Sequence, residues 1–323
     1  MAEILLEAKH VKKYFKTNKG MLHAVDDVSF SIPKGSTIGV VGESGCGKST
    51  LGRTLLCLNE PTGGEILFHG QELIGMKKKE RAKIRPKMQM IFQDPYSSLN
   101  GRMTVHQLIA EPLIVNKVCK DRKEMDQKVR EMMDTVGLAQ RLDQAYPHEL
   151  DGGRRQRIGV ARALVLEPEF VVCDEPVSAL DVSIQAQILN LLMDLQEQLG
   201  LTYLFITHDL SVVKHISDEI MVMYLGKCVE MAPSAEIFRN PVHPYTKALL
   251  AAIPVPGIES AHKKRELLQG EVTSPVNPKP GCRFAARCPY AAAQCTAEDI
   301  PLREVSPGHF AACCEKTAGP VIQ

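Results

Sequence analysis

Two apolar runs separated by an amphipathic segment mark the second half of the chain. Residues 170–173 and 202–206 are nearly continuous apolar stretches, as expected of parallel strands that are buried on both faces. Residues 184–198 between them repeat apolar positions at helical spacing. A third apolar run, at residues 36–41, is expected to be a buried strand as well. This strand–helix–strand alternation predicts an α/β fold with a parallel sheet.

The patterning changes on either side of this core. Residues 1–93 alternate apolar and polar positions between turn signals, which predicts short β-strands. Residues 101–166 have helical spacing and many charges, which predicts a helical insertion. The run 77–87 carries seven cations and is expected to be a solvated face.

The composition shifts once more near residue 241, where prolines become frequent and cysteines follow. We therefore expect a main domain over 1–240, with its helical subdomain at about 94–166, and a C-terminal extension over 241–323. The longest apolar stretches, such as residues 220–225, are too short to cross a bilayer. A chain of this kind is expected to work at a membrane only by docking onto another protein.

The charge balance argues against one class of partner, nucleic acid. The chain has 39 Lys and Arg against 38 Asp and Glu, a net charge of +1. This leaves no electrostatic case for nucleic acid as the main partner.

A glycine-rich segment after the first buried strand predicts a phosphate-binding loop. Backbone N–H groups of such a loop, at a helix N-terminus, point at anionic oxygens. Lys48 is expected to reach the outer phosphates, and the Ser49 hydroxyl to ligate Mg²⁺. The alternative is a chance glycine-rich turn, which the flanking strand and helix patterns disfavour. The expected nucleotide-binding residues are Gly42, Glu43, Ser44, Gly45, Cys46, Gly47, Lys48, Ser49 and Thr50.

Two carboxylates end the apolar run at 170–173. Asp174 at the strand tip is placed to hold Mg²⁺ through water, and Glu175 to orient and deprotonate an attacking water. An ordinary acidic turn is the alternative. The upstream phosphate loop favours a nucleotide-hydrolysing site.

With these motifs, the chain resembles an ATP-binding subunit of an ABC transporter. The resemblance implies that Gln93 is the Q-loop glutamine, which touches Mg²⁺, and that residues 178–181 form the D-loop. It likewise implies that His208 is the switch histidine at the γ-phosphate. Phe15 takes the position of the aromatic that stacks on adenine, with the adjacent Tyr14 as the alternative. The implied fold is a RecA-like ATPase core with a β-rich nucleotide subdomain, a helical insertion and a small cysteine-containing extension.

The family's signature motif, Leu-Ser-Gly-Gly-Gln, is altered here. The corresponding residues are Leu150, Asp151, Gly152, Gly153 and Arg154. In the family this motif binds the γ-phosphate of the ATP held by the partner subunit. An unpaired carboxylate there is repulsive, by about 4 kcal/mol for unit charges 4 Å apart at an effective dielectric constant of about 20.

Two alternatives remain for the altered signature. Asp151 is a good helix N-cap, and Arg154 offers a compensating charge. Either the site that uses this signature is weakened, which suits a heterodimer with a normal partner signature, or the substitution is tolerated and both sites hydrolyse.

Segments near the C-terminus narrow the resemblance. Residues 240–250, 280–289 and 180–186 resemble the ATPases of dipeptide and oligopeptide importers, in particular the second ATPase of the pair. Nickel and glutathione importers share much of this pattern and stay as alternatives. The implied partners are a related but different ATPase, two transmembrane permease subunits and, indirectly, a solute-binding protein, with the chain on the cytoplasmic face of the membrane.

Half of the ten cysteines lie in the last 42 residues. Because the others are scattered, as in a chain from a reducing compartment, this group favours a metal site over disulfides. The resemblance implies a [4Fe-4S] cluster on Cys282, Cys288, Cys295 and Cys313, with Cys314 as a substitute for the last. Zinc and unliganded thiols are the alternatives.

The resemblance implies a cycle of ATP binding and hydrolysis in a pair of ATPase subunits. ATP and Mg²⁺ dimerise two ATPase subunits, hydrolysis separates them, and Gln93 with the helical insertion passes the motion to the membrane subunits. A soluble ABC ATPase outside transport and a non-hydrolysing scaffold are the rival classes. The intact Lys48, Asp174, Glu175 and His208 argue against the scaffold.

Overall fold

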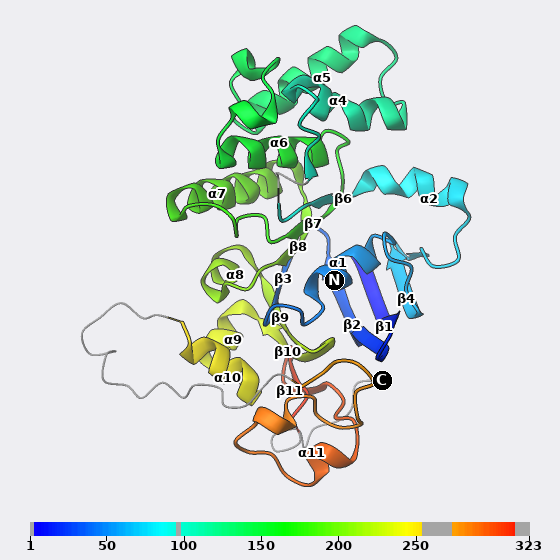
Figure 1. Cartoon of the computed structure of the whole chain (residues 1–323), viewed down its shortest axis with the longest axis vertical. Coiled ribbons are helices and arrows are strands. Elements are labelled where there is room, and N and C mark those ends of the chain that lie inside the picture. Colours follow the sequence, from blue (N-terminus) through cyan, green and yellow to red (C-terminus); the bar gives the residue numbers. More distant parts are fainter. Residues whose placement is uncertain (1–2, 95–97, 254–272, 314–323) are drawn as a thin grey trace, which may run out of the picture. The chain divides into compact units, whose positions relative to one another are not determined.

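The computed structural model describes residues 3–94, 98–253 and 273–313. Its chain divides into two compact units, which are described separately. The first unit comprises Met1–Leu5, Ile32–Ser36 and Gly75–Ile206. The second comprises Leu6–Ser31, Thr37–Ile74 and Thr207–Gln323. Figure 1 labels the elements along the chain.

The first unit is built on a parallel strand set covered by helices. Its strands are β6 (Met88–Ile91), β7 (Phe170–Asp174) and β8 (Thr202–Ile206), paired in parallel in the order β8-β7-β6. Every residue of β7 and β8 is buried, as the two apolar runs predict. Its helices are α2 (Lys78–Ile84), η1 (Arg85–Lys87), α4 (Val105–Asn116), α5 (Arg122–Thr135), η2 (Gln140–Leu142), η3 (Pro147–Glu149), α6 (Gly152–Leu164) and α7 (Val182–Leu199).

The helical insertion is present as predicted. Helix α6 packs against α4, α5 and α7, so it lies at the centre of this group (Figure 1). Helix α2 buries none of its residues, which confirms the solvated face expected for the cationic run. The long helix α7 ends where Gly200 takes a left-handed conformation, with φ 65°.

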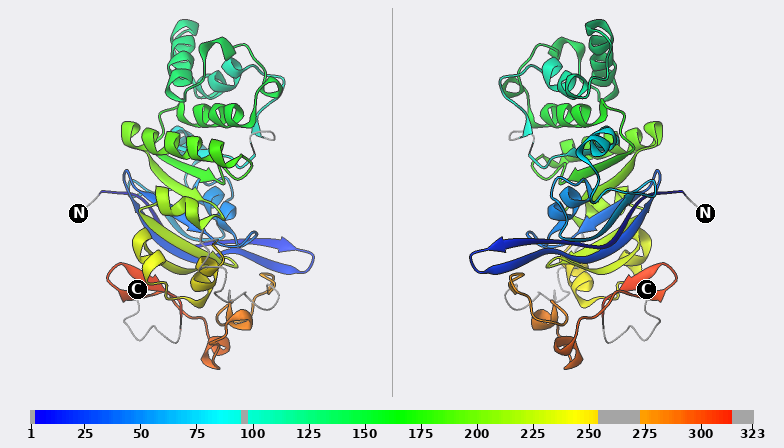
Figure 2. Two further views of the ribbon diagram at one scale, coloured as in Figure 1. Left: turned by 90° about the vertical axis from the view of Figure 1, so that its left-hand side faces the viewer. Right: turned by 90° about the vertical axis from the view of Figure 1, so that its right-hand side faces the viewer.

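The second unit holds an antiparallel sheet in the order β2-β1-β4-β5, formed by β1 (Ile4–Thr17), β2 (Gly20–Pro33), β4 (Gly63–Phe68) and β5 (Gln71–Glu72). The prediction of short strands is wrong for the first two, which have 14 residues each. They form one long ribbon in Figure 2. Local alternation and turn signals do not reveal how far a ribbon extends beyond its core, because that depends on the strands it pairs with.

The rest of the second unit surrounds strand β3 (Thr37–Val41), which is fully buried and pairs in parallel with β9 (Glu219–Tyr224). Antiparallel strands β10 (Lys227–Pro233), β12 (His309–Ala311) and β11 (Arg303–Ser306) continue from β9 in that order. Its helices are α1 (Lys48–Leu55), α8 (Leu210–Ile216), α9 (Ser234–Arg239), α10 (Pro244–Ala251), η5 (Ala285–Arg287) and α11 (Gln294–Ala297).

A buried carboxylate ties the C-terminal elements to this unit. Glu230 on β10 is fully buried and accepts hydrogen bonds from the backbone N–H groups of Val242 and His243, at 2.7 and 2.8 Å. A further partner is His309 on β12, whose Nε2 lies 2.7 Å from Oε1 of Glu230. Both carboxylate oxygens of Glu230 thus accept hydrogen bonds, as a buried carboxylate requires. No helix in the described ranges is long and apolar enough to cross a membrane.

Candidate nucleotide-binding site

The phosphate loop joins β3 to α1, as predicted. Two glycines make the loop possible: Gly42 has φ 151° and Gly47 has φ 106°. A Cβ at Gly42 would lie 2.2 Å from the carbonyl oxygen of Met223, and one at Gly47 would lie 2.0 Å from that of Ala24. Both positions therefore need glycine for conformation and for space.

Lys48 opens helix α1 and folds back over the loop. Its side chain is buried, and Nζ donates hydrogen bonds to the carbonyl oxygens of Gly42 at 2.7 Å and Glu43 at 3.0 Å. The ammonium group is thereby held at the helix N-terminus, where backbone N–H groups favour an anion. Burial raises the pKa of the neighbouring Cys46 thiol. The Cys46 side chain is 2% exposed and packs inside the loop.

The predicted carboxylates lie at the end of β7. Asp174 is its last residue and is 1% exposed. Glu175 follows in a left-handed conformation, with φ 47°, and its N–H donates to Ile206 at 2.9 Å. Such a conformation in a non-glycine residue is strained and occurs often at functional sites.

Gln93 lies against Glu175, although 82 residues separate them in the chain. The Gln93 Nε2 donates to Oε2 of Glu175 at 2.7 Å. The amide oxygen of Gln93 is then the atom left to accept or to ligate a cation. Ser178, in the segment that resembles the D-loop, donates its hydroxyl to the carbonyl oxygen of Glu175 at 3.2 Å. The structure thus brings together two predicted site residues, Gln93 and Glu175, and the segment 178–181.

His208 belongs to the second unit and is exposed, two residues after β8. The next residue, Asp209, caps α8 by accepting from the N–H of Ser211 at 2.7 Å. The position after a strand agrees with the one predicted for a switch histidine; its role stays a prediction.

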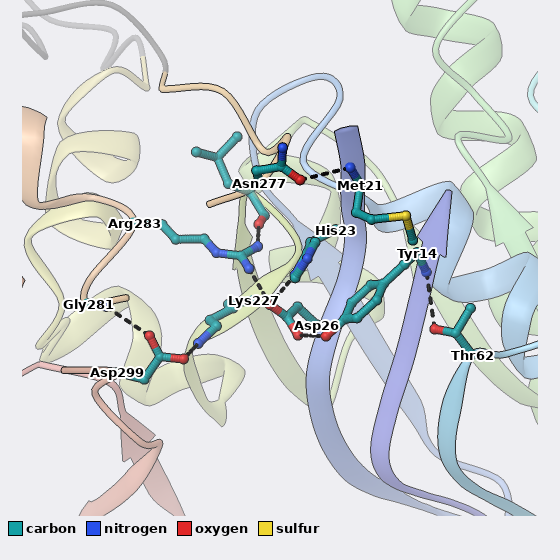
Figure 3. A network of polar contacts seen from close by, with 11 residues as sticks. Tyr14, Met21, His23, Asp26, Thr62, Lys227, Asn277, Gly281, Arg283 and Asp299 are labelled. Carbon is teal, nitrogen blue, oxygen red and sulfur yellow. Dashed lines mark hydrogen bonds and ion pairs between the residues drawn. The ribbon is translucent and has the colours of Figure 1, made fainter. Parts of the chain in front are cut away.

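The aromatic pair on β1 is divided between two faces of the strand. Tyr14 donates its hydroxyl to Asp26 and stacks on His23, with ring centroids 3.9 Å apart (Figure 3). Burial and the hydrogen bond to Asp26 raise the pKa of Tyr14. Phe15 lies on the opposite face, with Nζ of Lys13 4.7 Å from its ring centroid. Tyr14 is committed to an internal network, which favours Phe15 as the adenine partner.

The altered signature is internally compensated. Asp151 is the N-cap of α6, where Oδ1 accepts from the N–H of Arg154 at 2.8 Å. Its Oδ2 lies 2.6 Å from Nη1 of Arg154. The helix cap and the compensating charge expected for these residues are therefore both present. A Cβ on Gly153 would lie 2.8 Å from Ile184 on α7, which explains why a small residue is kept there.

The C-terminal cysteines that the structure describes lie near one another, but they are not arranged as a metal site. Burial raises the pKa of Cys282 to about 11, and the nearby Cys295, Cys288 and Cys313 add to the rise. Four neighbouring thiols are a donor set that suits iron–sulfur clusters or zinc. However, within the described ranges no group of three or more His, Cys, Asp or Glu is arranged to hold a metal ion. The structure therefore does not support the predicted cluster, and Cys314 lies outside the described residues.

Two residues of the site carried no signal in the sequence. The Tyr245 hydroxyl accepts from the N–H of Glu43 at 2.8 Å, and Arg287 donates to the carboxylate of Glu43. More than 200 positions separate each of them from the loop. Both lie in segments that the resemblance covers, but nothing in their spacing indicates contact with a phosphate loop.

Comparison with known proteins gives the family. Residues 25–178 match the ABC transporter family, and residues 229–295 match the C-terminal region of oligopeptide/dipeptide transporters. The oligopeptide transport ATP-binding protein OppF of Bacillus subtilis is 52% identical over 98% of both chains. The protein of the same name from Salmonella typhimurium is 49% identical over 96% of both.

Solved structures of ATP-binding cassettes are also similar to this chain. A dimeric post-hydrolysis state of the ATP-binding cassette MJ0796 with ADP and Pi is 28% identical, with a TM-score of 0.66, and covers 71% of this chain and 99% of its own. The cbiO1 subunit of the Clostridium perfringens transporter complex cbiONQ has a TM-score of 0.66 at 26% identity, over 74% of this chain and 92% of its own. The chain belongs to the ABC transporter family of ATP-binding proteins.

Proposed function

We propose that this chain is the ATP-hydrolysing subunit that powers uptake of dipeptides and oligopeptides through an ABC importer, from the cytoplasmic face of the membrane. The observation that carries the proposal is the 52% identity, over 98% of both chains, to a protein named for oligopeptide transport. The match to the oligopeptide/dipeptide C-terminal region supports the same substrate class.

The phosphate loop is proposed to bind the triphosphate. Lys48 exchanges its hydrogen bonds to Gly42 and Glu43 for phosphate oxygens, and the backbone N–H groups of the loop contribute the rest. When bound, Mg²⁺ neutralises charge on the phosphates. Hydroxyl, amide and carboxylate oxygens suit this cation, and Ser49, Gln93 and Asp174 carry them.

Hydrolysis is assigned to the end of β7. Glu175 accepts the proton of the attacking water, and Gln93 holds its carboxylate through the 2.7 Å hydrogen bond. Ser178 fixes the backbone at the same residue. His208 is proposed to contact the γ-phosphate, and Phe15 to stack on adenine.

We infer that the chain pairs with a different ATPase and docks on two permeases. A solute-binding protein delivers the solute to these permeases. In such a pair each nucleotide lies between one phosphate loop and the partner's signature. The signature of this chain has the compensated Asp151 in place of serine. The site that uses it is therefore proposed to be the slower of the two.

The cysteines Cys282, Cys288, Cys295 and Cys313 are proposed to hold a [4Fe-4S] cluster that staples the extension. The support is the donor set: the four thiols lie near one another, and thiolates are the usual ligands of iron–sulfur clusters. Anaerobic purification, with iron, sulfide and zinc assays, tests the proposal. If only zinc is found, the cysteines form a zinc site instead of the cluster. If iron, sulfide and zinc are all absent, the proposal is wrong.

The catalytic assignment is tested with Glu175→Gln in the assembled transporter. Loss of a general base lowers turnover by about 100-fold or more, while ATP stays bound and holds the ATPase dimer together. Glu167→Gln, at an exposed ion pair with Lys128, is the matched control and should turn over normally. Unchanged turnover in Glu175→Gln would refute the assignment.

The cargo is tested separately. Cells that lack the chain should lose uptake of a labelled tripeptide, and the wild-type chain should restore it whereas Lys48→Ala should not. Restored uptake of nickel or glutathione in place of peptide would move the chain to those importers. No effect on any uptake would favour a soluble ABC ATPase.

A further inference from the structure

The cysteine-bearing segment, defined as residues 281–295, brings two arginines to the nucleotide-binding part of the second unit. The side chains of Arg283 and Arg287 are only 6% and 7% exposed. Each is held by a carboxylate from a distant part of the chain: Asp26 on β2 for the first and Glu43 in the phosphate loop for the second. The planar guanidinium group of an arginine donates several hydrogen bonds at once, so a carboxylate partner is held in a defined position.

Arg287 grips the Glu43 carboxylate with both terminal nitrogens. Its Nη1 donates to Oε1 at 3.1 Å and to Oε2 at 2.9 Å, and Nη2 donates to Oε1 at 3.1 Å. The Tyr224 hydroxyl, 3.3 Å from Nη1, completes the contact.

Glu43 is thereby fixed at three atoms. Arg287 holds the carboxylate, the Tyr245 hydroxyl accepts from the N–H at 2.8 Å, and the carbonyl oxygen accepts from Nζ of Lys48 at 3.0 Å. Arg287 is therefore linked through Glu43 to Lys48, the lysine that is proposed to bind the phosphates.

Arg283 anchors the same segment at a second place. It donates to the carbonyl oxygen of Leu225 and to Asp26, which also accepts from the Tyr14 hydroxyl (Figure 3). The next residue after Leu225 is Gly226, whose N–H donates to the carbonyl oxygen of Cys46 in the phosphate loop at 2.7 Å. The segment thus reaches the loop by two routes.

We propose that the cysteine-bearing segment braces the nucleotide site, with Arg287 as a positioning residue that acts through Glu43. The inference rests on the proposed ATP binding and deepens it. Without Arg287, the Glu43 carboxylate is left uncompensated in a loop that must accept phosphate charge. The backbone of Glu43, whose carbonyl oxygen holds Lys48 before nucleotide binds, is also no longer fixed from the carboxylate side. Coupling is reciprocal, so bound nucleotide should also order the segment.

Binding of MgADP to the purified full chain by calorimetry tests the brace without hydrolysis. Arg287→Ala should raise Kd about tenfold in the wild-type background and less than about threefold in a Glu43→Gln background, because the arginine acts through that carboxylate. Lys227→Gln is the matched control: it removes the ion pair to Asp299 (2.5 Å), the residue that accepts from the N–H of Gly281 at the start of the segment. Its Kd should stay within about twofold of wild type.

Hydrogen exchange supplies a readout that a purely structural role would not move. MgADP should slow amide exchange across residues 281–295 in the wild type, including the Cys282 N–H bonded to the Cys295 carbonyl oxygen at 2.7 Å. The slowing should vanish in Arg287→Ala. Arg287→Lys, which keeps the charge, should retain part of the affinity and serves if the alanine variant does not fold.

The outcomes separate the two levels of inference. If the wild-type chain does not bind MgADP, the proposed ATP binding fails. If it binds, but Arg287→Ala has wild-type Kd, acts equally in both Glu43 backgrounds, or matches Lys227→Gln, the brace is wrong and the proposed function stands.

Discussion

Removing Arg154 should expose the charge that it now compensates in the altered signature. Its Nη1 lies 2.6 Å from Oδ2 of Asp151, while Oδ1 of Asp151 caps α6 through the backbone N–H of residue 154. Arg154→Gln removes the first contact and keeps the second, because the cap uses only backbone on that side. The variant therefore leaves a capped helix with an unpaired carboxylate at the surface proposed to meet a γ-phosphate.

The size of the effect follows from the geometry and exposure. Two unit charges 4 Å apart repel by about 4 kcal/mol at an effective dielectric constant of about 20. The side chains of Asp151 and Arg154 are 57% and 49% exposed, so solvent screens most of this. A residual penalty of about 1 kcal/mol corresponds to about a fivefold loss of turnover at that site.

The assay is ATP turnover of the assembled transporter with its partner ATPase and permeases. Asp151→Ser combined with Arg154→Gln restores the common Ser and Gln, keeps an N-cap, and should turn over at the wild-type rate or above. Arg122→Gln, which breaks an exposed pair with Asp126 (3.9 Å) on α5, is the matched control. The reasoning is refuted if Arg154→Gln turns over like wild type, or if the double variant is slower than the single one.

Three further outcomes are expected. Burial lowers the pKa of His243 to about 4; because the unfolded chain takes up this proton near pH 6.5, stability is full above that pH and falls below it. From pH 7 to pH 5 the loss is about 2 kcal/mol, so urea unfolding of His243→Asn should depend less on pH by that amount. Phe15→Ala should weaken MgADP binding about tenfold, whereas Tyr14→Phe, which keeps its ring, should change it by less than about threefold; equal losses would contradict the assignment of the two faces. Gly47→Ala should abolish nucleotide binding in the same titration, because its Cβ would lie 2.0 Å from the carbonyl oxygen of Ala24; retained affinity would show that the loop yields.

Local patterns in the sequence predict much of the fold and the positions of the candidate site residues. The buried strands at 170–173 and 202–206, the phosphate loop and the carboxylates after β7 were all legible, because each depends on a few neighbouring residues. The helix cap at Asp151 was legible for the same reason. The extent of β1 and β2 was not, since strand length depends on pairing partners elsewhere in the chain.

Tertiary structure alone decided how separate motifs meet. The contact of Gln93 with Glu175 joins residues 82 positions apart, and that of Arg287 with Glu43 joins residues 244 apart. Ion pairs between such positions leave no periodicity or spacing to read, because they arise only after the chain has folded the two segments together. The sequence by itself thus predicts which groups would handle a nucleotide. Only the fold decides which of these groups hold one another in place.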